Sequence, residues 1–425
     1  MLTNDLKSTQ KASAMPKKTK PNCERQLSLL DFLIEEMIKP DGGQIVYSML
    51  KMRSPDEVWR GVLVLPPGTF IEKIIAEFDK KSNIPLEIPF FVFFHFLAAY
   101  LLYNKISLKI EDKIIIPDIW TVVLANSGSG KSFVAKEIRE GIPDLGDLVC
   151  DMSGLASNAA FIESLVDNNN KLYIRDDFSE MYKQIQNACG PLSELKDTIL
   201  RLFNNDKIER KTKKESIIIE KSAIVFLGLT VEQQLSNILT AEDIFNGFAQ
   251  RFSFIIADKD RKKKMIDYPI WNITTKGWLD EWKHMVNNVI PNTQYTATAE
   301  GEKAFKESFK LLCNEKLDES FYRRQLWKAT KYALLYHIIL GKGNDVKVGA
   351  QEFGWAARVM HLMINDCLKL LEDHGMSEIE SKAQKVESLR NRLAAKGQQM
   401  TIRDIVRNIR TIKTVAEAKA IVSIL

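Results

Sequence analysis

The 425-residue chain has little of the chemistry that marks secreted, metal-bound or membrane-spanning proteins. Its five cysteines and five histidines are scattered without metal-ligand spacing, so neither a metal cluster nor a disulfide framework is expected. The N-terminus lacks the basic-then-apolar pattern of a secretion signal. One apolar run, residues 89–103, is shorter than the roughly 20 residues of a membrane helix and is interrupted by His95. We therefore expect a cytoplasmic protein with no membrane partner, in which this run is a buried helix.

The charge is uneven along the chain. The formal net charge is +5, and residues 1–26 hold six basic residues against two acidic ones. This segment has few apolar residues and no periodicity, which predicts a disordered basic tail. Contact with nucleic acid and a solubilising role are both open for such a tail. Apolar residues make up 45% of the sequence, which is enough for the remainder to fold around a large core.

Periodicity and composition divide the rest of the chain into four regions. Residues 27–118 are predicted to be a helical N-terminal domain that ends in a hairpin at 106–116. Residues 119–274 alternate between strands and helices and are predicted to be the core. Residues 275–376 are expected to form an all-helical lid, and residues 377–425 a small unit of short helices that follows a charged linker.

The central region predicts an α/β fold. Buried strands are expected at 120–124, 171–176, 223–228 and 252–256, with helices at 131–140 and 193–203 among them. Strands that alternate with helices favour a mostly parallel sheet that is covered by helices on both faces.

A Gly-rich segment follows the first of these strands and leads into a helix. Backbone N–H groups of such a loop surround phosphates, and the helix dipole adds positive potential. Lys131 would reach the outer phosphates, and the Ser132 hydroxyl would coordinate Mg²⁺. We therefore expect a P-loop that binds ATP and Mg²⁺, although Ala125 stands where the usual pattern has glycine. The expected nucleotide-binding residues are Asn126, Ser127, Gly128, Ser129, Gly130, Lys131, Ser132 and Phe133.

Carboxylates close the second predicted strand. Asp176 ends it and is expected to be the second protein group associated with Mg²⁺. The residue that polarises the attacking water is expected to be Asp177 or, as a second candidate, Glu180. An alternative interpretation is that Asp177 only caps the following helix.

Two more polar residues are candidates for the nucleotide site. Thr230 follows the third strand and would lie between the P-loop and Asp176, where it could orient the water or the γ-phosphate. It could equally be the N-cap of the next helix, with Gln233 completing a capping box. Arg251 precedes the fourth strand and is expected to face the γ-phosphate of a neighbouring subunit as an arginine finger. A structural salt bridge is the alternative for Arg251.

These features together resemble a large P-loop family of bacteria, phages and plasmids. That family is catalogued mostly as a domain of unknown function and is often found with primase modules. The resemblance spans residues 75–345 and rests on the segment entering the P-loop, the Asp176-Asp177 strand end and residues 247–252. It implies a role in replication of a mobile element, with a primase as a partner.

Several segments are also similar to AAA+ helicases of the minichromosome-maintenance and superfamily 3 type. Residues 207–221 resemble their β-hairpin, and Arg251-Phe252 resembles the pair that carries their trans-acting arginine. Residues 322–326 resemble their second sensor, with Arg324 or Arg323 as the arginine. The resemblance implies a homo-oligomeric ring, a hexamer, with ATP bound between subunits. Asp177 departs from the pattern, because many relatives have Glu at that position.

The tip of the predicted hairpin is basic. Its cationic residues are Arg210, Lys211, Lys213 and Lys214. In a ring this tip would point into the central channel, where such side chains grip DNA phosphates without reading sequence. A solvated charged turn is the alternative interpretation.

The C-terminal region carries a second basic element. Residues 401–404 and 414–417 fit the capping-box pattern and would start helices at 402–410 and 415–424. On the first helix, an apolar stripe (Ile402, Ile405, Val406 and Ile409) lies opposite three arginines (Arg403, Arg407 and Arg410). This pattern predicts a helix-turn-helix or winged-helix unit that binds DNA. A small helical cap with a solvated arginine face is the alternative.

The sequence therefore favours an ATP-dependent, ring-forming DNA helicase or translocase. A nucleotide-switched origin-binding initiator or helicase loader without unwinding activity is the second hypothesis. A small-molecule kinase is a third, which the helical lid and the proposed role of Arg251 disfavour.

Overall fold

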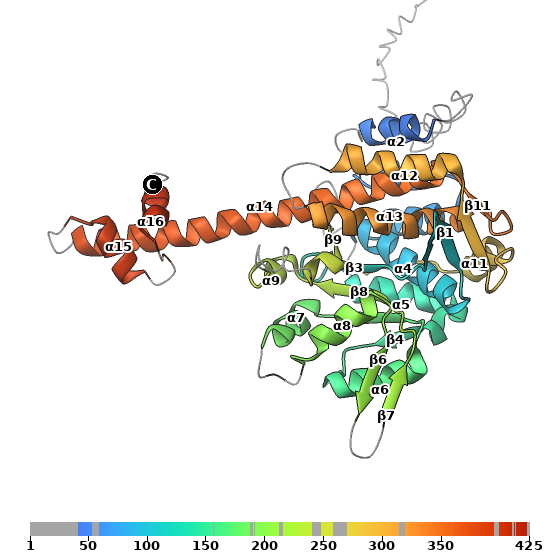
Figure 1. Ribbon diagram of the computed structural model, residues 1–425, viewed down its shortest axis with the longest axis horizontal. Helices are drawn as coiled ribbons and strands as arrows, with labels where there is room; N and C mark the ends of the chain where they lie inside the picture. The colour runs from blue at the N-terminus through green and yellow to red at the C-terminus, as the bar shows by residue number, and fades with distance from the viewer. Residues whose placement is uncertain are drawn as a thin grey trace, which may run out of the picture. The chain divides into compact units, whose positions relative to one another are not determined.

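Five parallel strands form the central sheet, in the order β4-β5-β8-β3-β9 (Figure 1). They are β3 (Trp120–Leu124), β4 (Val149–Asp151), β5 (Leu172–Asp176), β8 (Val225–Thr230) and β9 (Ser253–Ile256). The α/β class and four of these strands agree with the sequence prediction. Strand β4 was not predicted, because three partly exposed residues carry too little apolar pattern to be recognised.

The computed structural model describes residues 41–52, 59–155, 157–187, 190, 192–211, 216–239, 248–257, 270–313, 319–394, 399–409, 412 and 414–422. The predicted basic tail (1–26) and the first part of the predicted helical N-terminal domain (27–40) lie outside the described residues. So do Lys213, Lys214 and Arg410.

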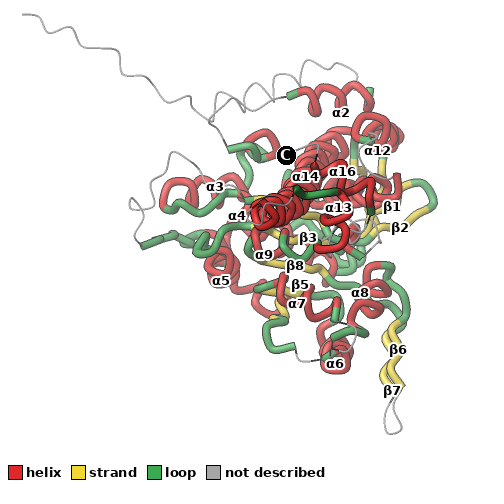
Figure 2. Tube along the Cα trace, turned by 90° about the vertical axis from the view of Figure 1, so that its left-hand side faces the viewer, coloured by secondary structure: helices red, strands yellow, loops and turns green. Residues whose placement is uncertain are grey.

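Helices cover both faces of the sheet, as the alternation of strands and helices predicts (Figure 2). Trp120 and Thr121 are consecutive in β3, so their side chains point to opposite faces. The Trp120 ring lies 5.4 Å from Phe203 of α8 (Leu195–Phe203), beside α7 (Phe178–Gln186). On the other face, the Thr121 hydroxyl lies 3.5 Å from the Tyr332 hydroxyl of α13 (Glu319–Ile339).

The apolar run expected to be a buried helix is α4 (Glu87–Tyr103), and this prediction is confirmed. Nearly all of its residues are buried, because the helix packs between the sheet and its neighbours α3 (Phe70–Lys81), α5 (Lys131–Gly141) and α13. Phe94 illustrates the packing, with its ring 5.8 Å from Tyr332. Within the described part of the chain, no helix is both long and apolar enough to cross a membrane.

The region expected to be an all-helical lid contains strands as well. Its helices are α11 (Trp278–Val286), α12 (Ala299–Leu312), α13 and the first part of α14 (Ala350–Ala394). A second sheet has the order β11-β10-β1-β2, from β11 (Lys347–Val348), β10 (Gln294–Ala297), β1 (Ser107–Ile110) and β2 (Lys113–Ile115). The predicted hairpin is thus present as β1 and β2. Because β1 also pairs in parallel with β10, the N-terminal and lid regions share one sheet.

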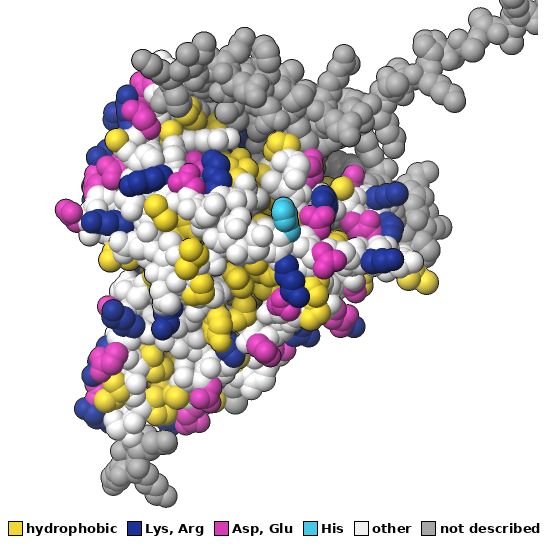
Figure 3. Space-filling model, turned by 90° about the vertical axis from the view of Figure 1, so that its right-hand side faces the viewer, with side chains coloured by type: hydrophobic (Ala, Val, Ile, Leu, Met, Phe, Trp, Pro, Cys, Tyr) yellow, Lys and Arg dark blue, Asp and Glu magenta, His cyan; other side chains and the backbone are white. Residues whose placement is uncertain are grey.

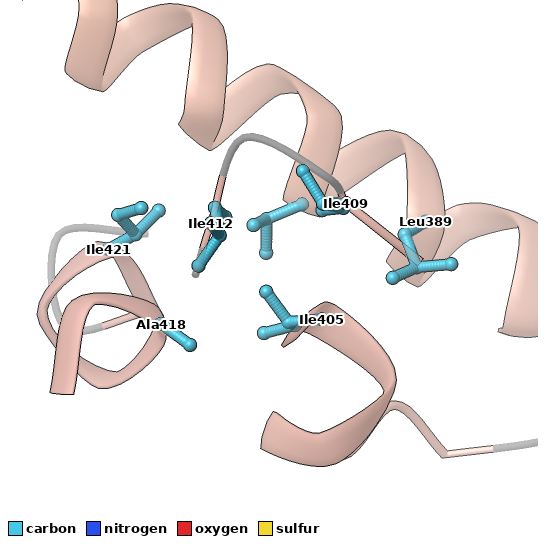
Figure 4. Packing of buried hydrophobic residues seen from close by; sticks show 7 residues of the cluster. Leu389, Ile405, Ile409, Ile412, Ala418 and Ile421 are labelled. Atoms are coloured by element: carbon cyan, nitrogen blue, oxygen red, sulfur yellow. The ribbon is translucent and has the colours of Figure 1, made fainter. Parts of the chain in front are cut away.

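Helix α14 continues through the linker expected at residue 377. No proline interrupts this stretch, and its Glu, Lys and Ser residues are compatible with a helix. The last third of α14 then forms a small core with α15 (Ile402–Asn408) and α16 (Val415–Val422). Figure 4 shows Leu389 of α14 together with Ile405, Ile409, Ile412, Ala418 and Ile421 in this core.

The described residues form several further elements. They are α2 (Gly42–Lys51), η1 (Val62–Val64), η2 (Pro143–Leu148), α6 (Asn158–Asn168), β6 (Ile208–Lys211), β7 (Ser216–Ile219), α9 (Glu232–Ser236) and η3 (Ala249–Arg251). Strands β6 and β7 pair antiparallel and extend away from the central sheet (Figures 1 and 2). The hairpin expected at residues 207–221 is therefore confirmed.

Candidate nucleotide-binding site

Three of the predicted site segments meet at one edge of the sheet. Strands β3, β5 and β8 are parallel, so their carboxyl ends lie at the same edge. The predicted P-loop follows β3, Asp176 ends β5 and Thr230 ends β8. Because β8 pairs with both β3 and β5, Thr230 lies between the P-loop and Asp176, in the place that the sequence predicts.

The P-loop turns at two glycines in the left-handed region. Gly128 has φ +73° and Gly130 has φ +81°, a conformation that other residues rarely adopt. Ala125 does not share it: this residue is fully buried, and its N–H donates to the Thr230 carbonyl over 3.1 Å. The backbone therefore does not require glycine at position 125, which explains how alanine is accommodated there.

Lys131 lies at the start of α5 and is half-buried. Its Nζ donates to the Ala125 and Asn126 carbonyls at 3.2 and 3.1 Å, and it lies 3.5 Å from the Ser129 hydroxyl. Burial lowers the pKa of the Lys131 ammonium, while the charges of Asp176 and Asp177 oppose that shift. The ammonium is thus held over the loop near two carboxylates, a position from which it can turn to an anionic ligand.

The Ser132 hydroxyl donates a hydrogen bond to the Asp176 carboxylate. Ser132 is exposed and Asp176 is half-buried, so two oxygen donors from different elements lie side by side at the loop. This pair fits Mg²⁺, which takes oxygen ligands and commonly uses one or two protein groups plus substrate phosphates. No group of three or more His, Cys, Asp or Glu side chains that could hold a metal occurs among the described residues.

Asp177 and Glu180 lie beside this pair. Asp177 adopts a left-handed backbone (φ 53°) at the start of α7, and its side chain makes no capping hydrogen bond. Asp177 thus occupies the N-cap position of α7, as the alternative interpretation expects, but without a capping hydrogen bond from its side chain. Glu180 is exposed, one turn further on, and accepts a hydrogen bond from Gln184. Of the two carboxylates, Asp177 is the one whose charge acts on Lys131.

Thr230 is the last residue of β8 and is fully buried. Its hydroxyl oxygen accepts the Ser179 N–H over 3.2 Å, which ties the first turn of α7 to the end of β8. The N-cap of α9 is Val231, so the alternative that Thr230 and Gln233 form a capping box is wrong. Thr230 therefore helps to position the helix that begins beside Asp177.

Arg251 lies at the opposite edge of the sheet. It ends η3, immediately before the amino end of β9, whereas the P-loop follows the carboxyl end of β3. Four or five residues of strand separate the two edges, which corresponds to about 15 Å. Arg324 lies at the same edge, because its guanidinium donates a hydrogen bond to the Gln250 side chain. Burial is the main cause that lowers the pKa of Arg251, and the charge of Arg324 lowers it further. Arg323 instead pairs with Glu319 on its own helix.

Sequence reasoning missed the residues that cover the start of α5. The Trp271 ring lies 5.2 Å from Phe133, and its Nε1 donates to the Asn83 Oδ1 over 2.8 Å. A Cβ added to Gly130 would lie 2.8 Å from Ile84 and 2.9 Å from Trp271. No local pattern identifies these residues, because they come from segments nearly 190 positions apart.

The described part of the predicted hairpin consists of its two strands. Arg210 and Lys211 lie on β6, where they pair with Ile217 and Ser216 of β7, and residues 212–215 lie outside the described residues. Arg210 pairs with Glu163 of α6 at 2.5 Å, and Lys211 pairs with Glu209. A pocket of about 300 Å³ lies between α6, α8 and β6, and none of its lining residues belongs to the P-loop.

The C-terminal unit has the predicted two-sided helix. The Thr401–Asp404 capping box is present at the start of α15. Ile405 and Ile409 are buried, Ile402 and Val406 pack against them, and Arg403 and Arg407 are exposed.

On the face of the molecule in Figure 3, the described basic and acidic side chains are interspersed rather than gathered by sign.

Searches with protein-family models and against curated proteins find no match to this sequence.

Proposed function

We propose that this protein is an ATP-dependent DNA helicase or translocase that assembles as a ring, a hexamer. It would act in the cytoplasm in replication of a phage or another mobile element, with a primase as a partner. The observation that carries the proposal is the contact between the Ser132 hydroxyl and the Asp176 carboxylate beside Lys131. Together these groups offer the oxygen ligands and the positive charge that a nucleoside triphosphate with Mg²⁺ requires.

The proposed hydrolysis uses groups from two subunits. Backbone N–H groups of the P-loop and Lys131 bind the phosphates, and bound Mg²⁺ would offset negative charge on the outer phosphates. Asp177, with Glu180 as the second candidate, accepts a proton from the attacking water. The sheet separates Arg251 from its own P-loop by about 15 Å. This separation supports a role for Arg251, with Arg324 beside it, at the nucleotide of a neighbouring subunit.

The first test is ATP hydrolysis and strand separation by the purified full-length protein. We expect hydrolysis that single-stranded DNA stimulates, and unwinding of a forked duplex. Lys131→Ala should abolish both activities and leave the melting temperature unchanged, because the side chain contacts only the loop itself. Wild-type protein without DNA-stimulated hydrolysis and without unwinding would overturn the proposal.

A nucleotide-switched initiator or loader is the alternative function. The feature that favours it is the C-terminal unit, which has its own apolar core and two exposed arginines on α15. That function predicts ATP-dependent binding of duplex DNA without unwinding. The same unwinding assay, combined with a duplex-binding measurement, separates the two functions.

A further inference from the structure

Two buried polar residues of α13 hold the backbone on both sides of Arg251. The Gln325 Nε2 donates to the Gln250 carbonyl at 3.3 Å and to the Phe252 carbonyl at 3.2 Å. The Lys328 Nζ donates to the same Gln250 carbonyl at 3.3 Å. The short η3 turn is therefore bound to α13 at the residues immediately before and after Arg251.

The two side chains also bind each other and the start of β9. Lys328 donates to the Gln325 Oε1 at 3.1 Å and to the Ser253 hydroxyl at 3.2 Å, and that hydroxyl contacts the Gln325 Oε1 at 3.2 Å. Gln325 and Lys328 are each only 3% exposed. The three hydrogens of the Lys328 ammonium thus have three acceptors, in a closed network that leaves little freedom to the turn.

Burial of the Lys328 amine in this network is unfavourable for the stability of the fold. Burial lowers the pKa of Lys328 well below its usual value, and the charges of Lys331, Arg324 and Arg251 lower it further. None of the acceptors that Lys328 contacts is a carboxylate. The charge of Cys367 opposes this shift in the pKa of Lys328. A buried amine among other cations costs stability that an apolar side chain of the same length would not, and such perturbed groups cluster at functional sites.

We propose that Gln325 and Lys328 are positioning residues for Arg251. They fix the η3 turn so that the Arg251 guanidinium, whose carbon lies 5.4 Å from the centre of the Phe203 ring, is held in one place at the amino edge of the sheet. The lid helix α13 thereby determines the position of the arginine that one subunit contributes to the nucleotide of the next. This inference rests on the proposed function, in which Arg251 acts between subunits.

The test uses mixed assemblies of full-length variants. A Lys131→Ala subunit supplies Arg251 but cannot hydrolyse ATP, and an Arg251→Ala subunit has an intact P-loop but supplies no arginine. Mixing the two should restore hydrolysis that neither has alone. If it does not, Arg251 does not act between subunits, and the proposed inter-subunit mechanism fails together with this inference.

Where mixing restores activity, Lys328→Met is then placed in one partner at a time. In the Lys131→Ala partner it should lower the restored kcat about tenfold and leave KM unchanged, because the turn that carries Arg251 is loosened. In the Arg251→Ala partner it should have no effect. Equal losses in both arrangements, or no loss in either, would overturn the positioning role while leaving the inter-subunit mechanism intact.

Two further variants separate positioning from folding. Gln325→Leu should reproduce the directional loss, and it keeps the test valid if Lys328→Met does not fold. Thr330→Val is the matched control, because this buried α13 hydroxyl donates to the Trp327 carbonyl of its own helix rather than to η3. We expect Thr330→Val to leave the restored kcat unchanged in both arrangements.

Discussion

At the scale of single residues, the predicted P-loop depends on backbone conformation as much as on side-chain chemistry. Gly128 and Gly130 both have positive φ, but their surroundings differ. A Cβ at Gly128 would meet nothing within 4 Å, whereas a Cβ at Gly130 would press on Ile84 and Trp271. A substitution at Gly128 therefore meets only the cost of the left-handed conformation, whereas a substitution at Gly130 meets the cost of a steric overlap as well.

Gly130→Ala should consequently be the more harmful of two matched substitutions. Gly128→Ala should lower the free energy of unfolding by about 1 kcal/mol, the cost of the backbone conformation alone. Gly130→Ala should lower it by about 2 kcal/mol or more and weaken nucleotide binding, because Ile84 and Trp271 must also shift. Urea unfolding and binding of a fluorescent nucleotide analogue measure both effects, and equal losses would contradict the steric argument.

His95 gives the fold a defined pH dependence. Burial lowers its pKa to about 4, while an unfolded chain keeps the usual value of about 6.5. Between these values the unfolded state binds more protons, so the free energy of unfolding falls as the pH falls. From pH 7.5 to pH 5 we expect a loss of about 2 kcal/mol from this residue.

His95→Gln provides the comparison, since glutamine does not titrate. Urea unfolding of both proteins at pH 7.5 and pH 5 isolates the histidine contribution as the difference between the two losses. Parallel losses in the two proteins would show that His95 is not the titrating group.

At the scale of elements, the C-terminal unit combines a buried stripe and an exposed basic face on one helix. Arg403 and Arg407 are exposed on α15, while Ile405 lies in the core that Figure 4 shows. The two arginines can therefore be removed without disturbing the packing.

Arg403→Ala combined with Arg407→Ala should weaken binding to duplex DNA whatever its sequence. Removal of two phosphate contacts should also reduce the slope of log affinity against log salt by about 2. Fluorescence anisotropy over a series of salt concentrations measures both quantities. Lys306→Ala with Lys310→Ala, two exposed lysines of α12, is the control, and an equal effect of that pair would indicate non-specific charge loss.

At the scale of the whole molecule, the sheet divides the candidate nucleotide site into two halves. Lys131, Ser132 and Asp176 lie at the carboxyl edge, and Arg251 lies at the amino edge with Arg324. If one nucleotide uses both halves, they must come from different copies of the chain. Assembly into a closed ring satisfies this requirement for every copy.

Arg251→Ala should therefore lower kcat by about 10³-fold or more and leave nucleotide affinity unchanged. Particle imaging with an ATP analogue and single-stranded DNA should show a ring for both wild type and variant. Loss of nucleotide affinity in Arg251→Ala would place this arginine at the nucleotide of its own subunit, against the separation of the two sheet edges.

Local sequence patterns determined the elements that carry the proposed chemistry. The strand, Gly-rich turn and helix around Lys131, the apolar run of α4 and the Thr401–Asp404 capping box each follow from residues close together in the chain. Periodicity and turn chemistry act over one or two turns of backbone, so such features can be recognised without a structure.

Only the tertiary structure decided how distant segments combine. The pairing of β1 with β10, the contacts of Trp271 with Asn83 and the start of α5, and the hold of Gln325 and Lys328 on the η3 turn join residues 70 or more positions apart. These contacts depend on how large apolar surfaces pack together, and a single sequence carries no local signal for that choice. The strand, the Gly-rich turn and the helix around Lys131 could thus be predicted from their own residues, whereas the residues that cover the turn and the edge on which Arg251 lies could not.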